Sequence, residues 1–326
     1  MTDCDVLVVG GGPAGSTVSA LLAECGWRVT LLEKEHHPRF HIGESLLPWN
    51  LPIFERLGVL DQVHAIGIKK PGADFNSMME VGGHHQFHFS FALDPSQPYA
   101  YEVRRSEFDS LLLRNSAKKG TNVIEGVGIP EYLLQTIATG HPEMKHRMRK
   151  AVLINNEARA TGNYSYQSTR MRGDRHIMVG DAYAFIDPIF SSGVLLGMNS
   201  GLLGAEAVDA WLRGDPAAEG RFRHFESMVR RGVKTFSWFI WRFNSPGMRS
   251  LMLHPGNPLR VQEAVTSLLA GDVFRNIGAR SRFWLFKFWY TMFSVRYARE
   301  SFRLWWLRVR NPKVVFTGGS TPVDVA

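Results

Sequence analysis

The first 33 residues contain a complete strand–turn–helix–strand unit, and no other feature limits the fold as strongly. The apolar run at residues 3–9 lacks alternation, which predicts a strand buried on both faces. An Ala- and Leu-rich run at residues 16–25 predicts a helix that Gly26 ends, and residues 28–32 predict the next strand. Two strands joined through a helix indicate an α/β fold with a parallel sheet.

The turn between the first strand and the helix has the spacing Gly-x-Gly-x-x-Gly, at Gly10, Gly12 and Gly15. The first glycine permits a tight turn, the second lets the backbone approach a pyrophosphate, and the third lets helix and strand pack closely. The helix N-terminus offers amides and a positive dipole end to phosphate groups. Glu33, at the end of the second strand, can accept ribose hydroxyls. The unit therefore predicts a dinucleotide-binding site.

A second motif follows the strand predicted at residues 176–179 and comprises Gly180, Asp181 and, further on, Pro188. It leads into a helix predicted at residues 193–212. Together with the N-terminal glycines, this motif resembles the FAD-binding architecture of the para-hydroxybenzoate-hydroxylase type. The resemblance implies that the Asp181 carboxylate contacts the flavin ribityl chain and that the helix N-terminus points at the isoalloxazine, where its dipole favours an anionic reduced flavin.

Two further segments resemble the flavin-dependent halogenases, particularly those that act on phenolic or pyrrolic substrates. They are Pro-Arg-Phe-His-Ile-Gly-Glu-Ser-Leu-Leu-Pro at residues 38–48 and Val-Arg-Arg-Ser at residues 103–106. The resemblance implies reduced FAD from a separate flavin reductase, O2, and chloride or bromide, used to oxidise or halogenate an electron-rich aromatic. The residues it places at the cofactor are Gly10, Gly12, Pro13, Ala14, Gly15, Glu33, Lys34, Arg39, Ser45, Arg105, Gly180, Asp181 and Pro188.

The catalytic candidate is Lys70, which holds the place of the lysine that directs hypohalous acid in those halogenases. An ammonium in a confined pocket can donate a hydrogen bond to the oxidant, and desolvation tunes its pKa. The alternative is that Lys69 and Lys70 form an ordinary solvated pair before a turn, and the sequence does not decide between the two. The same resemblance implies a halide site at the amides of Ser192 and Gly193, since a helix N-terminus suits an anion.

The sequence departs from the halogenase pattern in the middle of the chain. It has neither an Asp-Ala-Ser-Gly turn nor a Trp-x-Trp-x-Ile-Pro signature, so it reads as though a block were missing between Val127 and Glu131. In the family that block covers the substrate side of the flavin and excludes water, which an oxidant-generating site requires. The alternatives are a monooxygenase or a prenyl-type reductase on the same scaffold, and an inactive flavin-binding fragment.

We expect a discontinuous FAD-binding domain, a reduced substrate domain and a helical, aromatic-rich C-terminal region. Their expected boundaries are 1–73, 100–127 and 171–215 for the first, 74–99 and 128–170 for the second, and 216–326 for the third. Further predicted elements are helices at 49–57, 106–118 and 131–138, a hairpin of strands 75–81 and 86–91, and a strand at 122–127.

Composition excludes several other classes of protein. Two cysteines in 326 residues cannot form a disulfide scaffold or a multi-cysteine metal site. The histidines at 84, 85 and 88 have no carboxylate or cysteine at ligand spacing, so no metal is expected. Neither a signal peptide nor a membrane span is apparent, and we expect a soluble, cytoplasmic protein.

The basic residues are concentrated near the C-terminus. Residues 275–313 hold ten lysines and arginines and one acid, Glu300, so the net charge of +8 does not indicate nucleic-acid binding. Residues 283–307 interleave aromatic and basic side chains. This pattern fits a surface for a membrane or for an acidic partner, such as a carrier protein that presents a tethered substrate. The favoured alternative is a helical lid whose aromatics pack over the substrate domain while its arginines reach solvent.

Overall fold

The predicted strand–helix–strand unit forms the centre of a three-stranded parallel sheet. The computed structural model describes residues 4–76, 84–127, 165–243, 245–253, 257–274 and 277–299, together with 302 and 306. The strands β1 (Val6–Val9), β2 (Val29–Leu32) and β7 (Asn122–Ile124) lie in the order β1-β2-β7. Helix α1 (Pro13–Glu24) joins the first two and begins three residues earlier than predicted, because a proline is well suited to the first helical turn.

Short antiparallel pairs lie beside this sheet. The predicted hairpin is present as β4 (Gly72–Asn76) paired with β5 (His84–His88), but its strands are displaced from the predicted bounds, since His84 and His85 belong to β5 and not to the turn. Strand β3 pairs with β6. The remaining strands and short 3-10 helices are η1 (Pro48–Asn50), β3 (Ile68–Lys70), β4 (Gly72–Asn76), β5 (His84–His88), η2 (Phe89–Phe91), β6 (Ala100–Glu102), β8 (Tyr166–Gln167), β9 (Arg172–Gly173), β10 (His176–Ile177), η3 (Gly180–Ala182), β11 (Ala184–Phe185), η4 (Pro188–Phe190) and η5 (Pro258–Arg260).

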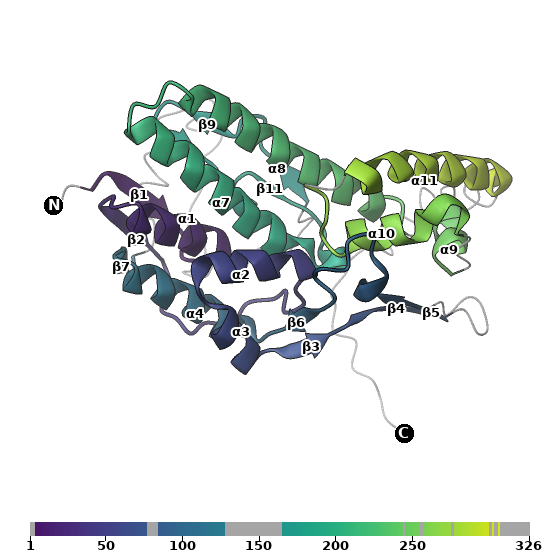
Figure 1. Cartoon of the computed structure of the whole chain (residues 1–326), viewed down its shortest axis with the longest axis horizontal. Helices are drawn as coiled ribbons and strands as arrows, with labels where there is room; N and C mark the ends of the chain where they lie inside the picture. Colours follow the sequence, from purple (N-terminus) through teal and green to yellow (C-terminus); the bar gives the residue numbers. More distant parts are fainter. Residues whose placement is uncertain are drawn as a thin grey trace, which may run out of the picture.

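Helices cover the sheet and form the other end of the molecule (Figure 1). Helix α1 is packed between the sheet and α7, and α7 runs side by side with α8. The predicted helical character of the C-terminal region is confirmed across the residues described. The α-helices beyond α1 are α2 (Leu51–Leu57), α3 (Leu60–Ile66), α4 (Arg105–Lys118), α7 (Ser192–Leu212), α8 (Ala218–Ile240), α9 (Pro246–Leu253), α10 (Val261–Leu269) and α11 (Ile277–Arg296).

The contact of α1 with α7 depends on the absence of a side chain at Gly201. A Cβ atom there would lie 2.8 Å from the carbonyl oxygen of Ala14 and 3.3 Å from the Cβ of Thr17. Both neighbours belong to α1, so the two helix backbones approach each other closely at this point. The packing places the N-terminal ends of α1 and α7 on the same side of the molecule, next to Gly180 and Gly197.

Three predictions about strands are corrected. Strand β1 is not buried on both faces, since Leu7 and Val9 are 56% and 64% exposed and line a cavity. The strand predicted at 176–179 is limited to β10, which pairs antiparallel with β9 rather than with the main sheet. The strand predicted at 122–127 ends at Ile124 because the chain turns at Gly126, whose φ is +76°. The helix predicted at 131–138 lies outside the described residues, and the domain boundaries stay predictions.

Within the part of the chain that the structure describes, no helix has both the length and the apolar character needed to span a lipid bilayer.

We expect Gly201→Ala to lower the free energy of unfolding by about 1–3 kcal/mol, because the added methyl group must push α7 away from α1. Gly220→Ala on α8 is the matched control, since a Cβ atom there meets nothing within 4 Å. That change should be neutral or stabilising by up to about 1 kcal/mol. Urea unfolding of both variants measures the difference, and equal free energies would contradict the proposed close contact.

Candidate functional site

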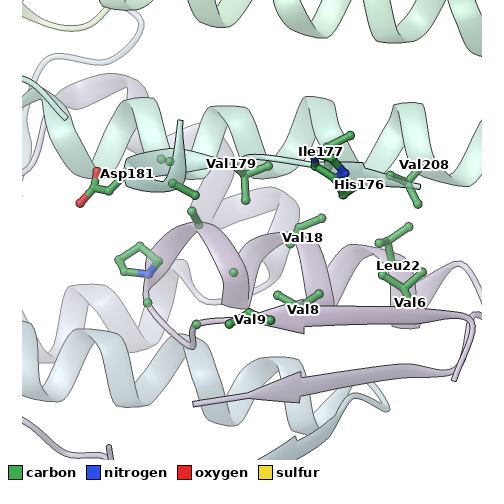
Figure 2. A pocket seen from close by; sticks show the side chains of 18 of the residues that line it. Val6, Val8, Val9, Val18, Leu22, His176, Ile177, Val179, Asp181 and Val208 are labelled. Atoms are coloured by element: carbon green, nitrogen blue, oxygen red, sulfur yellow. The ribbon is translucent and has the colours of Figure 1, made fainter. Parts of the chain in front are cut away.

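A cavity of about 1770 Å³ lies between the β1–α1 unit and the segment that runs from β9 to the start of α7. Figure 2 shows Val6 and Val8 of β1 on one side and Ile177 and Val179 across from them, with Asp181 at one end. The wall is therefore apolar beside β1 and polar toward the turn that contains Asp181. The two motifs that the sequence separates by some 170 residues meet at this cavity.

The glycine turn has the geometry that its spacing predicts. Gly10 has a φ of +101°, and a Cβ on Gly15 would lie 1.9 Å from the Gly10 carbonyl oxygen, so neither position tolerates a side chain. A Cβ on Gly12 meets nothing within 4 Å, and no described side chain caps the first turn of α1. The open backbone at Gly12 and the uncapped amides of α1 form a cradle suited to phosphate groups.

Glu33 fixes this turn from behind. Its Oε2 accepts a hydrogen bond of 2.6 Å from the Gly11 amide, and its Oε1 accepts one of 3.0 Å from the Glu35 amide. Burial of the Glu33 carboxyl tends to raise its pKa, but the two amide hydrogen bonds and nearby cationic side chains outweigh this and lower the pKa. The carboxylate is thus held in its charged form at the edge of the predicted nucleotide site.

Arg105 holds the loop that contains the Gly-Glu-Ser segment. Its Nε and Nη2 donate to Asp109 at 2.7 and 3.0 Å, and its Nη1 donates to the carbonyl oxygen of Ile42 at 2.8 Å. Arg105 and Asp109 are both buried. Because its donors are engaged within the protein, Arg105 shapes the cavity wall by anchoring the loop to α4. Arg39, also on the wall, pairs with Glu35 at 2.9 Å.

The Gly180-Asp181 turn lies at the polar end of the cavity. Gly180 has a φ of +56°, and its amide donates to Ser200 Oγ at 2.7 Å, which ties the turn to α7. The side chain of Asp181 is open to the cavity, while the protein atoms around it desolvate the carboxyl and raise its pKa. The charges of His41 and Arg105 oppose that shift. Asp181 is therefore placed to meet a polar group of a ligand, as the motif predicts.

Lys70 joins this site through a neighbouring strand. Its Nζ donates to Ser45 Oγ and lies 3.8 Å from Glu102 Oε1 and 5.8 Å from the centre of the Phe89 ring. The backbone of residues 44–46 runs antiparallel to residues 101–103, and β3 pairs with the other edge of β6, so β6 brings Ser45 and Lys70 together. The Lys70 side chain is only 16% exposed.

The environment of Lys70 differs from that of Lys69. Burial desolvates the Lys70 ammonium and lowers its pKa, and the nearby Glu102 carboxylate opposes this shift. Lys69, the preceding residue on β3, is exposed, with its Nζ 4.3 Å from the centre of the Tyr99 ring. The description as a solvated pair therefore fits Lys69 and not Lys70.

The start of α7 completes the polar end. Ser191 has a left-handed backbone (φ +54°) and donates through its Oγ to Ser45 Oγ at 2.8 Å. The next residue, Ser192, is fully buried, whereas Gly193 lines the cavity with open space where a Cβ would lie. Hydroxyl groups thus connect the Lys70 ammonium with the N-terminus of α7.

The structure brings most of the predicted cofactor residues to one wall. The cavity wall does not include Glu33, Lys34, Lys70 or Ser192, and Lys34 is exposed. The side chain of Pro188 lies outside the described residues. The predicted residues on the wall are Gly10, Gly12, Pro13, Ala14, Gly15, Arg39, Ser45, Arg105, Gly180, Asp181 and Gly193.

Several wall residues were not predicted from the sequence. Arg172 and Arg175 come from the β9–β10 hairpin, and Trp211 and Asp215 come from the end of α7 and the loop after it. No motif in the sequence marks these four positions. Phe40 and His41, also on the wall, lie inside the segment at 38–48 that carried the resemblance.

Comparisons with known proteins agree with this geometry. Residues 3–133 match the family model of the FAD binding domain. The tryptophan 2-halogenase of Chondromyces crocatus is 29% identical over 64% of this chain and 62% of its own. The 1H-pyrrole-2-carbonyl-[peptidyl-carrier protein] chlorinase of Pseudomonas fluorescens is 22% identical over 83% and 90%. The solved structure of the myxobacterial chondrochloren halogenase, an FAD-dependent halogenase, covers 82% of this chain and 90% of its own at 25% identity with a TM-score of 0.60.

The chain is similar in sequence and in fold to flavin-dependent halogenases. It spans less than two thirds of the length of the tryptophan halogenase. FAD is the cofactor that these matches assign to the chain. The residues present fit that group, because Gly12 leaves backbone open where a Cβ would intrude and the cavity continues from there to Asp181.

We expect Gly12→Val to weaken FAD binding by on the order of 100-fold or more, because the side chain would occupy the space where the pyrophosphate approaches the backbone. The fold should be retained within about 0.5 kcal/mol, since the Gly12 backbone is extended (φ −69°) and nothing lies within 4 Å of an added Cβ. Gly220→Val, equally open but on α8, serves as the control. Titration of each purified variant with FAD, followed by flavin absorbance, gives the two dissociation constants; equal affinities would contradict the cradle at Gly12.

A separate prediction concerns the acid stability that Glu33 provides. The pKa of Glu33 is lowered in the folded protein, so its stabilising effect is present above the ordinary glutamate pKa and is lost as the pH falls through the folded value. Glu33→Gln should therefore be less stable than the wild type at pH 7. The gap in unfolding free energy should narrow below about pH 4.3. Urea unfolding across this range tests it, and a gap that stays constant with pH would show that the charge of Glu33 is irrelevant.

Proposed function

We propose that the protein is an FAD-dependent oxidoreductase of the halogenase type, acting on an electron-rich aromatic substrate of the phenolic or pyrrolic kind. The observation that carries the proposal is the link from Lys70 through Ser45 to Ser191 at the start of α7. Through this link a shielded ammonium, which is not itself on the wall, would act by way of Ser45 and Ser191, two residues on the wall of a cavity whose other features fit FAD. Bound FAD, in its reduced form, would supply the electrons that activate O2 for oxidation of a halide.

The cofactor contacts follow from the cavity wall. The Gly10–Gly15 turn and the first amides of α1 would bind the pyrophosphate, and Glu33 would hold that turn in place and contact the ribose. Asp181 would meet the ribityl chain at the polar end. The remaining predicted contacts, Lys34 and Pro188, belong to the same proposal.

The role proposed for Lys70 is to hold and direct a proton toward the oxidant. Desolvation lowers the pKa of its ammonium, and this makes the group a better proton donor than a solvated lysine. Ser45 accepts a hydrogen bond from Nζ, which fixes the direction of the side chain. The carboxylate of Glu102, at 3.8 Å, opposes this lowering of the pKa.

The halide, chloride or bromide, is proposed to bind at the amides of Ser192 and Gly193. These residues begin the 21-residue helix α7, and Gly193 is open to the cavity. Unpaired amides and the positive end of a helix dipole favour an anion at this place. Two hydroxyl groups lie between the proposed halide site on α7 and the ammonium on β3. This arrangement fits separate roles, in which α7 binds the halide and Lys70 donates its proton to the oxidant.

The proposed partners follow from the relatives. The matched pyrrole chlorinase acts, by its name, on a substrate attached to a peptidyl carrier protein, which supports a tethered aromatic substrate for this chain. A separate flavin reductase would deliver the reduced cofactor, and binding to nucleic acid is not proposed. A monooxygenase or a prenyl-type reductase on the same scaffold is the alternative among enzymes, and a protein that binds flavin without halogenation is the alternative outside them.

We expect Lys70→Ala to reduce halogenation by at least about 100-fold, because the variant loses its proton donor to the oxidant. Its affinity for FAD should stay near that of the wild type. Lys69→Ala is the matched control, on the same strand but exposed, and should retain activity. The assay supplies FAD, a flavin reductase with NADH, halide and a set of phenols and pyrroles, with products identified by mass spectrometry.

The outcomes separate the alternatives. Loss of FAD binding in Lys70→Ala would show that this lysine has a structural role. Oxygenated product without halogen from the wild type would favour the monooxygenase. Saturable FAD binding by the wild type with neither product would favour the flavin-binding protein without halogenation.

A further inference from the structure

Helix α11 has two different faces. The helix packs on α9 and α10, and its inner aromatic side chains, Phe283, Phe286 and Tyr290, also reach the end of α8. The ring centres of Phe283 and Tyr290 both lie 5.3 Å from that of Trp238. These aromatics are covered, but the ring contacts recorded for them are with the end of α8 and not with the predicted substrate domain that the lid interpretation names. The outer face is not covered, and large apolar side chains remain on the surface there.

The outer face carries a continuous apolar stripe. It consists of Trp284, Phe288, Met292 and Val295, which are 75%, 57%, 54% and 69% exposed. Their spacings of four, four and three residues put them within an arc of roughly 80° around the helix, over a length of about 16 Å. Exposed apolar side chains that gather in this way, rather than singly, mark a surface that contacts something else.

The charges around the stripe have one sign. Residues 273–299 contain six lysines and arginines and no aspartate or glutamate. Arg296 and Arg299 are exposed at the end of the stripe, and Lys287 lies along its side. The pKa of Lys287 is lowered by burial and by the positive charges of Lys234 and Arg242, which lie near and just after the end of α8 and add to the positive charge near this helix.

These features favour one kind of partner. An acidic protein would satisfy the arginines, but it would also have to present an apolar strip matched to four adjacent side chains on a convex helix. The interface of an anionic bilayer satisfies both, since apolar side chains sink to the acyl boundary while lysines and arginines meet lipid phosphates. The helix also lies at the end of the molecule away from the N-terminal sheet (Figure 1), and the four side chains of its stripe are exposed.

We propose that the outer face of α11 docks the protein on the surface of an anionic phospholipid membrane. The contact would be peripheral, made by the stripe together with its basic flanks. It does not depend on halogenation, because the stripe and the flanking cations are separate from the residues of the cavity.

The test is flotation of the full chain, loaded with FAD, with two kinds of vesicle. One contains phosphatidylcholine alone, and the other contains phosphatidylcholine with phosphatidylglycerol. We expect flotation with the anionic vesicles, weaker flotation with the neutral ones, and a decrease with added salt, which screens the charges. Absence of flotation with the anionic vesicles at low salt would overturn the proposal.

Two pairs of variants identify the surface. Trp284→Ser with Phe288→Ser, and separately Arg296→Glu with Arg299→Glu, should each lower the vesicle partition coefficient by at least about tenfold. The matched controls are Ile68→Ser, an exposed apolar residue on β3 that does not line the cavity, and Arg221→Glu with Arg223→Glu at the start of α8. The start of α8 is roughly 30 Å from its contact with α11. The controls should float like the wild type.

Several results would count against the proposal. Equal loss in controls and test variants would show a general charge effect rather than docking through α11. Unchanged flotation of the Trp284→Ser, Phe288→Ser variant would place the contact elsewhere. A dimer in size-exclusion chromatography that this variant abolishes, without any vesicle binding, would assign the stripe to a second copy of the chain. Circular dichroism checks that every variant keeps its helices.

Discussion

The close approach of backbones around α1 is the constraint on which the site depends. Gly15 lets α1 lie against the β1 turn, and Gly201 lets α7 lie against α1. Because α7 crosses α1 at that distance, its N-terminus and the Gly180 turn reach the same cavity as the glycine-rich turn. Larger side chains at these contacts would separate the two motifs, so packing rather than chemistry sets how far apart they lie.

A buried ion pair fixes the loop at the polar end of the cavity. The buried pair of Arg105 with Asp109 is a costly arrangement unless every donor finds an acceptor, and Arg105 meets this requirement by also bonding the Ile42 carbonyl. The loop is thereby fixed to α4, and Ser45 follows from the same loop onto the edge of β6. The position of the Lys70 ammonium, through its bond to Ser45, is thus linked to an ion pair that has no contact with Lys70 itself.

The parts of the fold that the sequence predicts correctly are those with local causes. Hydrophobic runs, Gly26 and the glycine turn determine β1, α1 and β2 from neighbouring residues alone. The prediction that Leu7 and Val9 are buried is wrong. Burial depends on which segments lie beside a strand, and the hydrophobic pattern of the strand itself carries no information on that. The difference between Lys69 and Lys70 has the same kind of cause, since it arises from the pairing of β3 with the distant strand β6. The arginines of the β9–β10 hairpin line the cavity only together with segments that are distant in the sequence.

Both the apolar side of the cavity and the outer face of α11 leave large apolar side chains exposed, but the two surfaces differ in shape. Leu7 and Val9 are exposed, but they lie inside a concave wall, where a bound ligand can cover them and gain affinity from their burial. Trp284 and Phe288 are exposed on a convex helix, where a ligand of small size gains little contact. Only an extended surface can cover a ridge of this shape, and the surrounding positive charge selects an anionic one. Shape therefore separates the cofactor site from the docking site, although both begin as apolar residues left on the surface.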